Sequence, residues 1–184
     1  MTETPTPHDA QSLAERLLAP LGNRWLHTKA VAARAASLAD AVPARDQELL
    51  LVAAWCHDLG YAPDLAITGL HPLDGARFLA SHGYPTRLCQ LVAHHSAATF
   101  EAEERGLSAA LAAEWHDEAD AVRDALWTAD MTTGPQGQAL DYPSRLTEVL
   151  DRYGADSQVG RAMTRAQSAI QEAIERTERR LAVR

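Results

Sequence analysis

The sequence predicts an all-α fold, and two observations lead to that expectation. Apolar residues recur at helical intervals along most of the 184-residue chain, and no segment alternates apolar and polar residues for long enough to build a sheet. Proline and glycine divide the chain into segments of helical length. With 46% hydrophobic and 23% charged residues, the composition is that of an ordinary globular protein. We therefore expect one domain over residues 9–184, preceded by a disordered lead-in over residues 1–8.

The first three helices are predicted from apolar stripes and from residues suited to their ends. A first helix is expected over about 9–19, before the sequence APLG stops it. The second is expected over about 24–42, where a stripe of residues three or four apart begins at His27. Asp46 suits the N-cap of a third helix, QELLLVAAWCH, and Gly60 suits its C-terminal stop.

Proline and glycine mark the bounds of the later helices. Pro72 lies in the first turn of the segment HPLDGARFLASHG, Gly83 follows its end, and Pro85 opens TRLCQLVAHHSAA. An acidic connector is expected near 101–118. Further helices are expected over about 119–131, 143–153 and 156–182. The apolar stripe of the last helix is expected to pack on the bundle, and a dimer interface, giving a possible homodimer, is the lesser alternative.

Charge and cysteine content exclude several classes of protein. The formal net charge of −8 argues against a nucleic-acid partner, although a local group of cations can still attract a small anionic substrate. No leader sequence and no apolar run near the roughly 20 residues of a membrane helix are seen, so a cytoplasmic protein without membrane contact is expected. Cys56 and Cys89 are too few for a disulfide framework and are expected to be buried, reduced thiols.

Histidine and aspartate occupy positions where these helices would normally carry leucine. His27 shares a helix face with Val31, and Asp130 lies on an apolar face of its own helix. His95 continues an apolar stripe, whereas His94 points to one side. Taken singly, each histidine is most simply a hydrogen-bonded core residue.

The full set of these residues is harder to bury without a cation. Inward-facing histidines and aspartates fall on four or five expected helices: His27, His57, Asp58, His71, His94, His95 and Asp130. Unpaired buried polar groups are costly, and one or two divalent transition-metal ions (Fe, Mn, Zn, Ni or Co) would partner most of them at once. His57 and Asp58 are consecutive, so their side chains diverge by about 100° around the helix axis, and the carboxylate can bridge toward a second ion.

These residues, in this order, resemble the HD-domain superfamily of metal-dependent phosphohydrolases, whose fold is an all-α bundle. The resemblance covers roughly residues 20–135 and rests on His27, the HD pair at 57–58, His71 in HPLDGARFL, the HH pair at 94–95 and Asp130 in WTADMTTGPQG. It implies one ion held by His27, His57, Asp58 and Asp130. In dinuclear members, which include HD-GYP phosphodiesterases, a small bacterial diadenosine tetraphosphate hydrolase and mixed-valent di-iron oxygenases, residues matching His71 and the 94–95 pair hold a second ion. No GYP triad follows the HH pair here, which argues against cyclic dinucleotides as substrates.

The resemblance implies hydrolysis of a nucleotide or another small phosphate ester by a metal-bound hydroxide. Tyr61 is expected to line the pocket or to close the helix end, and Lys29 and Arg77 are expected to be surface residues. Three alternatives stay open: a di-iron oxygenase with the same ligands, a metal-containing regulatory or ligand-binding module, and a plain helical interaction domain. The candidate catalytic residues are the bridging Asp58 and two cations that suit a phosphoryl group, Arg24 and Arg34.

Overall fold

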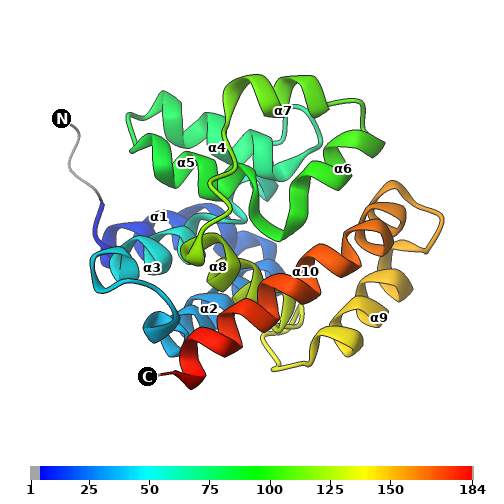
Figure 1. Ribbon diagram of the computed structural model, residues 1–184. Helices are drawn as coiled ribbons and strands as arrows, with labels where there is room; N and C mark the ends of the chain where they lie inside the picture. Colours follow the sequence, from blue (N-terminus) through cyan, green and yellow to red (C-terminus); the bar gives the residue numbers. More distant parts are fainter. Residues whose placement is uncertain (1–4, 184) are drawn as a thin grey trace.

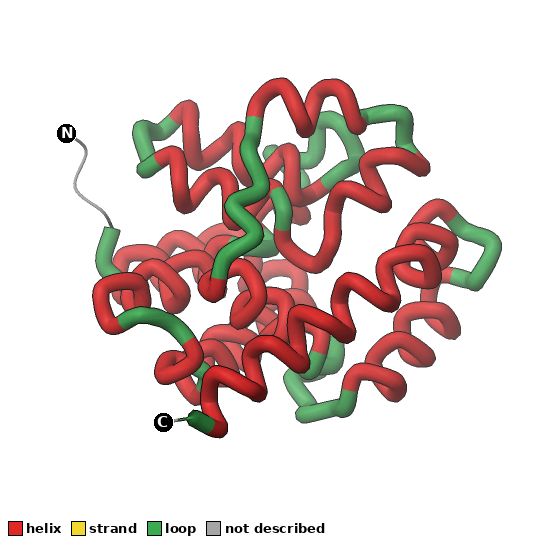
Figure 2. The backbone as a smooth tube through the Cα atoms, in the orientation of Figure 1, coloured by secondary structure: helices red, strands yellow, loops and turns green. Residues whose placement is uncertain are grey.

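Ten α-helices make up most of the described chain. The computed structural model describes residues 5–183, and within that range the only extended pairing is an isolated bridge between Thr133 and Ala139. Figures 1 and 2 show the helices packed around one another, joined by loops and turns. The predicted all-α fold is confirmed. The helices are α1 (Pro7–Leu18), α2 (Asn23–Ser37), α3 (Gln47–Cys56), α4 (His71–Ser81), α5 (Thr86–Ala93), α6 (Ala98–Glu104), α7 (Ser108–Glu114), α8 (Ala121–Met131), α9 (Tyr142–Tyr153) and α10 (Gln158–Ala182).

The first helix begins earlier than expected. α1 starts at Pro7, where the Thr6 hydroxyl accepts a hydrogen bond from the backbone N–H of Asp9 and the Asp9 carboxylate accepts one from the backbone N–H of Thr6. This reciprocal capping holds the helix start, so the prediction of a disordered lead-in was wrong for Pro7 and His8. Residues 1–4 of the predicted lead-in lie outside the described residues.

Two other predicted boundaries were wrong. α2 ends at Ser37 and a 3₁₀ turn, Ala39–Ala41, follows it, so the helix expected to reach residue 42 is shorter. The connector expected over 101–118 contains part of α6 and the whole of α7. Each of these helices is only seven residues long, which is too short for a repeating apolar stripe to be visible.

The two ends of α3 also differ from expectation. The Asp46 carboxylate does not cap α3 but accepts a hydrogen bond of 2.6 Å from Arg87 of α5. Arg87 also pairs with Glu118 and Asp120, so it ties the segment before α3 to the segment before α8. At the other end, α3 stops at Cys56 and a 3₁₀ turn, Leu59–Tyr61, follows, so Gly60 is not the residue that ends the helix.

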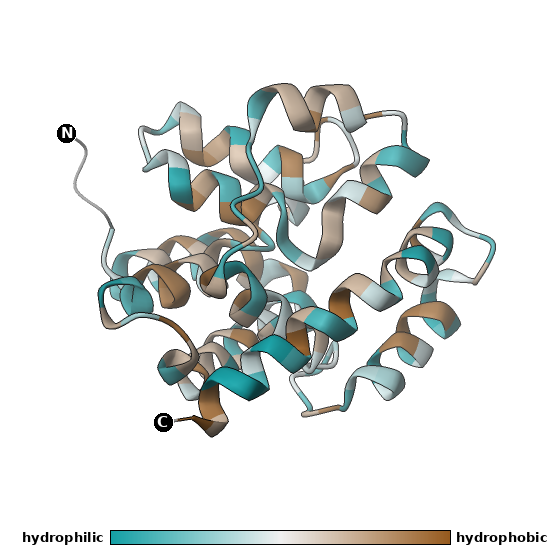
Figure 3. Ribbon diagram, in the orientation of Figure 1, coloured by the Kyte–Doolittle hydropathy of each residue, from teal (hydrophilic) through white to brown (hydrophobic). Residues whose placement is uncertain are grey.

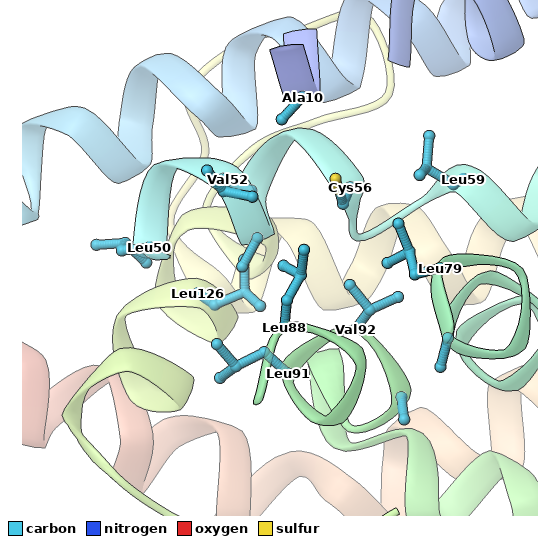
Figure 4. Close-up of a cluster of buried hydrophobic side chains, with 14 of the residues drawn as sticks. Ala10, Leu50, Val52, Cys56, Leu59, Leu79, Leu88, Leu91, Val92 and Leu126 are labelled. Atoms are coloured by element: carbon cyan, nitrogen blue, oxygen red, sulfur yellow. The ribbon is translucent and has the colours of Figure 1, made fainter. Parts of the chain in front are cut away.

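A hydrophobic core lies between α1, α3, α4, α5 and α8. Figure 4 shows its side chains gathered from these helices, with Leu50 and Val52 from α3 near Leu126 from α8. Cys56 and Cys89 are both free thiols buried in this core, as predicted, and burial raises the pKa of Cys56 to about 12. The core therefore fixes the C-terminal ends of α3 and α5, which the HD and HH pairs follow.

The C-terminal helix packs across the bundle. α10 contacts α8 and α6 and lies beside α9 near its N-terminal end (Figure 1). Met163 and Ile170 of α10 join Trp127 of α8 in a second buried cluster, and Figure 3 shows polar and apolar residues alternating along α10. The expected packing of the last helix on the bundle is confirmed. None of the helices described here has both the length and the apolar character needed to cross a bilayer.

Candidate metal centre

Six polar side chains from five parts of the chain meet in the interior. They come from α2, the turn after α3, the first residue of α4, the turn after α5 and the end of α8: His27, His57, Asp58, His71, His95 and Asp130. All are buried except His71, which is partly buried. Polar groups removed from water need partners, so their mutual geometry decides what the site can bind.

The six side chains form two groups of three. Ligand atoms of His27, His57 and Asp130 lie within 4.8 Å of one another, and those of Asp58, His71 and His95 do the same. Typical metal–nitrogen and metal–oxygen bonds are about 2.0–2.2 Å, so three ligand atoms at such spacings can surround one ion.

Asp58 lies between the two groups. Its Oδ2 atom is 3.3 Å from His57 Nε2 and 3.8 Å from His27 Nε2. Its Oδ1 atom is 3.4 Å from His71 Nε2 and 3.8 Å from His95 Nε2. Each oxygen therefore faces a different pair of imidazoles, which is the arrangement that lets one carboxylate bridge two ions.

Backbone hydrogen bonds fix the orientation of three imidazoles. A carbonyl oxygen can only accept, so each ring carries its proton on Nδ1 and, when neutral, leaves the lone pair of Nε2 free for a metal. The Nδ1–H groups of His27, His57 and His95 donate to the carbonyl oxygens of Gly134 (3.1 Å), Ala54 (2.7 Å) and Val92 (2.6 Å), respectively.

The remaining ring nitrogens fit a cation better than they fit one another. Among the described residues, the buried Nε2 atom of His57 has no hydrogen-bond partner. The Nε2 atoms of His71 and His95 lie 3.1 Å apart, and because the backbone bond of His95 puts its proton on Nδ1, His71 is the donor in this hydrogen bond. A divalent ion in the first group would give His57 Nε2 the partner that it lacks, and an ion in the second group would take the place of the hydrogen bond between His71 and His95.

Charges within the cluster shift its pKa values in directions that suit a cation site. Burial raises the pKa of Asp58, but Arg24 and His57 outweigh it and hold that pKa well below its ordinary value. Burial also raises the pKa of Asp130, but the neighbouring His27 and His57 rings outweigh it and hold that pKa well below its ordinary value. Burial and the neighbouring His95 lower the pKa of His71. Both carboxylates are thus ionised, and the His71 imidazole is neutral.

His57 is the exception among the imidazoles. Burial lowers the pKa of His57, but the adjacent carboxylate of Asp58, together with that of Asp130, outweighs burial and raises the pKa to about 9. The two carboxylates thus favour positive charge at His57, and a cation bound beside them gains the same attraction.

A stack of side chains borders the second group. Arg24 donates from a guanidinium nitrogen to Asp58 Oδ2 at 2.6 Å, and its central carbon lies 3.8 Å from the centroid of the Tyr61 ring. The Tyr61 ring stacks on the His71 ring, with 3.9 Å between centroids and 23° between planes. Tyr61 also lines the pocket above the cluster, so it does more than close the helix end.

This arrangement can be compared with known proteins. The family model described as the HD domain matches residues 24–156, which include all six residues of the two groups. The chain belongs to the HD-domain family. Searches of curated proteins and of solved structures gave no match. The superfamily indicated by the residue order is therefore confirmed, and the buried cluster of this HD domain fits the divalent-metal site that the superfamily implies.

Of the residues predicted to bind metal in this HD domain, His94 does not join the cluster. Its Nε2–H donates to the carbonyl oxygen of Trp115 at 3.1 Å. α5 ends at Ala93, and the next turn has left-handed backbone at Ser96 (φ 49°) and Ala97 (φ 58°), an unusual conformation for residues other than glycine. His94 and His95 follow the helix end directly, where consecutive side chains point in different directions, so only His95 reaches the other side chains of the cluster.

Of the two arginines predicted at the site, only one lies there. Arg24 lies at the cluster, but Arg34 is exposed, and its Nε–H donates to the hydroxyl of Thr132 at 3.4 Å. Arg34 lies seven residues after His27, which is about 10 Å along the helix axis, so it does not reach the site where it was expected. Lys29 is exposed and Arg77 pairs with Glu114 at 2.8 Å, so neither lies at the cluster, as expected of surface residues.

A pocket opens over the cluster, and the sequence reasoning missed one of its walls. Asp58, His71, His95 and Asp130 line one part, and residues of α9 and α10 line another. A signal for this wall was present, because Arg145 lies three residues after Tyr142 and four before Val149 on the buried face of α9. The pattern is the same as the one that singled out His27. The residues missed are Arg145, Val149, Arg152, Tyr153, Val159 and Met163.

Proposed function

We propose that this HD domain is a metal-dependent phosphohydrolase that acts on a nucleotide or another small phosphate ester. The observation that carries the proposal is the position of Asp58, whose two oxygens face two groups of imidazoles beside a pocket. A pair of ions bridged by a carboxylate suits this reaction, because it neutralises phosphoryl oxygens and supplies a hydroxide nucleophile at neutral pH.

The ligand roles in this proposal follow the two groups. His27, His57 and Asp130 hold one ion, His71 and His95 hold the other, and Asp58 is shared. The Ser96 hydroxyl donates to Oδ2 of Asp130, which leaves Oδ1 directed at His27, 2.9 Å away. Ser96 therefore orients a ligand without binding the metal itself.

Arg24 is the cation that we assign to the reacting phosphoryl group. Its bond to Asp58 accounts for one of five N–H donors, and the side chain lines the pocket, so further donors can bind an oxygen of the ester. Charge developing on that oxygen in the transition state strengthens such a bond. Arg34 has no such position, so the proposal no longer includes it.

The pocket favours a small ester over a polymer. Its enclosed part is small, about 60 Å³, and the rest is open to solvent, so a group the size of a phosphoryl fits at the cluster while the organic part of an ester extends outward. Val149, Val159 and Met163 give it an apolar wall against which the organic part of an ester can pack. The absence of nucleic-acid and membrane partners, a possible homodimer and a cytoplasmic location stay predictions.

A phosphate-release assay without oxygen tests the proposal. The protein, purified without chelators and loaded with Mn²⁺, is incubated anaerobically with a panel of nucleotides and small phosphate esters. It should release phosphate, Asp58→Ala should not, and the matched surface change Asp64→Ala should act like the wild type. Turnover that needs oxygen and a reduced iron pair would reject the hydrolase in favour of a di-iron oxygenase. No turnover under either condition would reject it in favour of a regulatory or ligand-binding module.

A further inference from the structure

A guanidinium group with an unused donor faces the pocket from α9. Arg145 is only 5% exposed and lines the pocket, and its Nε atom has no hydrogen-bond partner among the described residues. Its NH1 group donates to Glu148, one turn further along α9. A buried donor without an acceptor is destabilising, and an anionic ligand that reached Arg145 would complete its bonds.

Arg152 brings a second cation to the same wall. Its Nε atom lies 3.3 Å from Oε1 of Glu148, so this one carboxylate serves both arginines. Its guanidinium carbon lies 4.7 Å from the centroid of the Tyr153 ring, which restricts its orientation. Arg145 and Arg152, the arginine pair, therefore carry one positive charge more than Glu148 neutralises.

The arginine pair is separate from the six side chains of the candidate metal centre, called the metal cluster below. In the part of the chain that the structure describes, neither member forms an ion pair with Asp58 or Asp130. Glu101 also lines the pocket, but Arg105 holds its carboxylate at 2.7 Å. The arginine pair and Arg24 line an adjoining pocket as well, so the pair lies where the two pockets meet. An anionic group bound at the cluster thus leaves the arginine pair free for another.

We infer that the arginine pair binds a second phosphoryl group, so that the substrate is a diphosphate, such as a nucleoside diphosphate or an organic diphosphate ester. The inference rests on the proposed function for the first phosphoryl group, which the metal cluster binds. Planar guanidinium groups present paired N–H donors that match phosphoryl oxygens, and Glu148 holds both groups in place.

Binding of phosphonates to the metal-loaded protein tests the inference without relying on turnover. Inorganic phosphate, methylenediphosphonate and phosphonoacetate are titrated by calorimetry, and the metal content is measured after each titration. Arg152→Gln, in which the changed side chain is 33% exposed, avoids the folding risk of a neutral residue at Arg145. It should weaken diphosphonate binding about tenfold and phosphate binding less than about twofold. Arg145→Lys keeps the charge but loses the planar fork, and should weaken diphosphonate binding several-fold.

Arg179→Gln is the matched control, because Arg179 is an exposed arginine in the last turn of α10 and should leave both affinities unchanged. Equal loss of phosphate and diphosphonate affinity in Arg152→Gln, or no loss, would overturn the inference. Phosphonoacetate binding as tightly as diphosphonate would overturn the phosphoryl assignment. If no ester is hydrolysed but Arg152→Gln still weakens only diphosphonate binding, the proposed hydrolase function is wrong and the assignment of the arginine pair is correct. If esters are hydrolysed but Arg152→Gln weakens phosphate and diphosphonate binding equally, only the assignment of the arginine pair is wrong.

Discussion

At the scale of the residue, two adjacent side chains leave the end of α3 in different directions. α3 stops at Cys56, and His57 contributes to one group of ligands while Asp58 Oδ1 faces the other. Successive residues near a helix end differ by about 100° around the axis, so His57 points into one group while Asp58 lies between the two groups. In the proposed two-ion site, this His-Asp dipeptide joins the two groups of ligands.

The HH pair gives the sharpest test at this scale. His95→Gln should reduce the metal content from two ions to one per chain, because His95 Nε2 lies 3.8 Å from the bridging carboxylate. His94→Gln should keep both ions, because the His94 ring is bound to the carbonyl oxygen of Trp115 instead. Elemental analysis after gel filtration measures both variants. Loss of an ion from His94→Gln but not from His95→Gln would show that the second group is wrongly assigned.

Helical periodicity predicts the direction of a side chain better than its distance from the site. It placed His27 and Asp130 inward, where the structure has them. It also selected Arg34, whose direction agrees with that of His27 but which lies two turns away. Arg145 shows the same pattern and was passed over, because nothing in the order of motifs drew attention to α9.

At the scale of the element, close backbone contact joins the turn after α3 to α4. A Cβ atom at Gly60 would overlap the carbonyl oxygen of His71 and lie 2.8 Å from the backbone nitrogen of Gly75. A Cβ atom at Gly75 would in turn lie 3.1 Å from the backbone nitrogen of Gly60. Only glycine allows this approach, which sets the distance between Asp58 and His71.

Gly60→Ala tests this contact. The added methyl group should lower the free energy of unfolding by about 1–3 kcal/mol and, by displacing His71, weaken the second ion more than the first. Urea unfolding and metal titration measure the two effects. Gly106→Ala is the control, because its Cβ meets nothing within 4 Å and its φ of +70° costs stability without moving a ligand. A Gly60→Ala protein with wild-type stability and both ions would contradict the assigned role.

Buried ion pairs between α8 and α10 predict a stability that depends on pH. Asp124 is 0% exposed and accepts hydrogen bonds from Arg176 (2.8 and 2.9 Å) and Arg180 (2.9 Å). Burial raises the pKa of Asp124, but the two arginines lower it below its ordinary value of 3.8. Because the folded pKa is below the unfolded one, these pairs stabilise the protein above about pH 4, and the contribution is lost as the pH falls through the folded pKa.

Asp124→Asn should accordingly lower the free energy of unfolding by about 3 kcal/mol at pH 7. This is the low end of the usual cost of breaking a buried ion pair, because both arginines remain in contact with water. The difference from the wild type should shrink below about pH 4. Urea unfolding from pH 7 to pH 3 measures this, with the exposed Glu172→Gln as a near-neutral control. A difference that stays constant with pH would mean that the charge of Asp124 is not what stabilises the contact.

The bounds of a helix were predictable where an apolar stripe was flanked by a residue typical of a helix start or end. Pro72 and Gly83 bracket α4 as expected. Pro7 is also a start signal, and Thr6 and Asp9 have capping-box spacing, but the several prolines and threonines nearby favoured a disordered interpretation. The short helices α6 and α7 were not predictable from periodicity, because seven residues make only two turns.

At the scale of the whole molecule, the pocket joins two parts of the chain. The metal cluster comes from α2 to α8, within the match to the HD domain, whereas α10 lies beyond residue 156 and outside that match. Which faces of α9 and α10 meet the cluster depends on packing between distant helices, for example of Met163 with Trp127. The sequence alone therefore predicted the side chains of the cluster, with His94 in excess, but not the wall of α9 and α10 that faces them. That wall is where we place the selection of the substrate.

Anomalous diffraction from crystals of the Mn²⁺-loaded protein tests the central claim most directly. Two peaks about 3.5–4 Å apart are predicted, the usual spacing of bridged pairs. One peak should lie among His27, His57 and Asp130, the other beside His71 and His95, and Asp58 should contact both. A single peak with His71 and His95 both more than about 5 Å away, when metal–nitrogen bonds are near 2 Å, would contradict the two-ion account. No peak at the cluster would contradict the metal site itself.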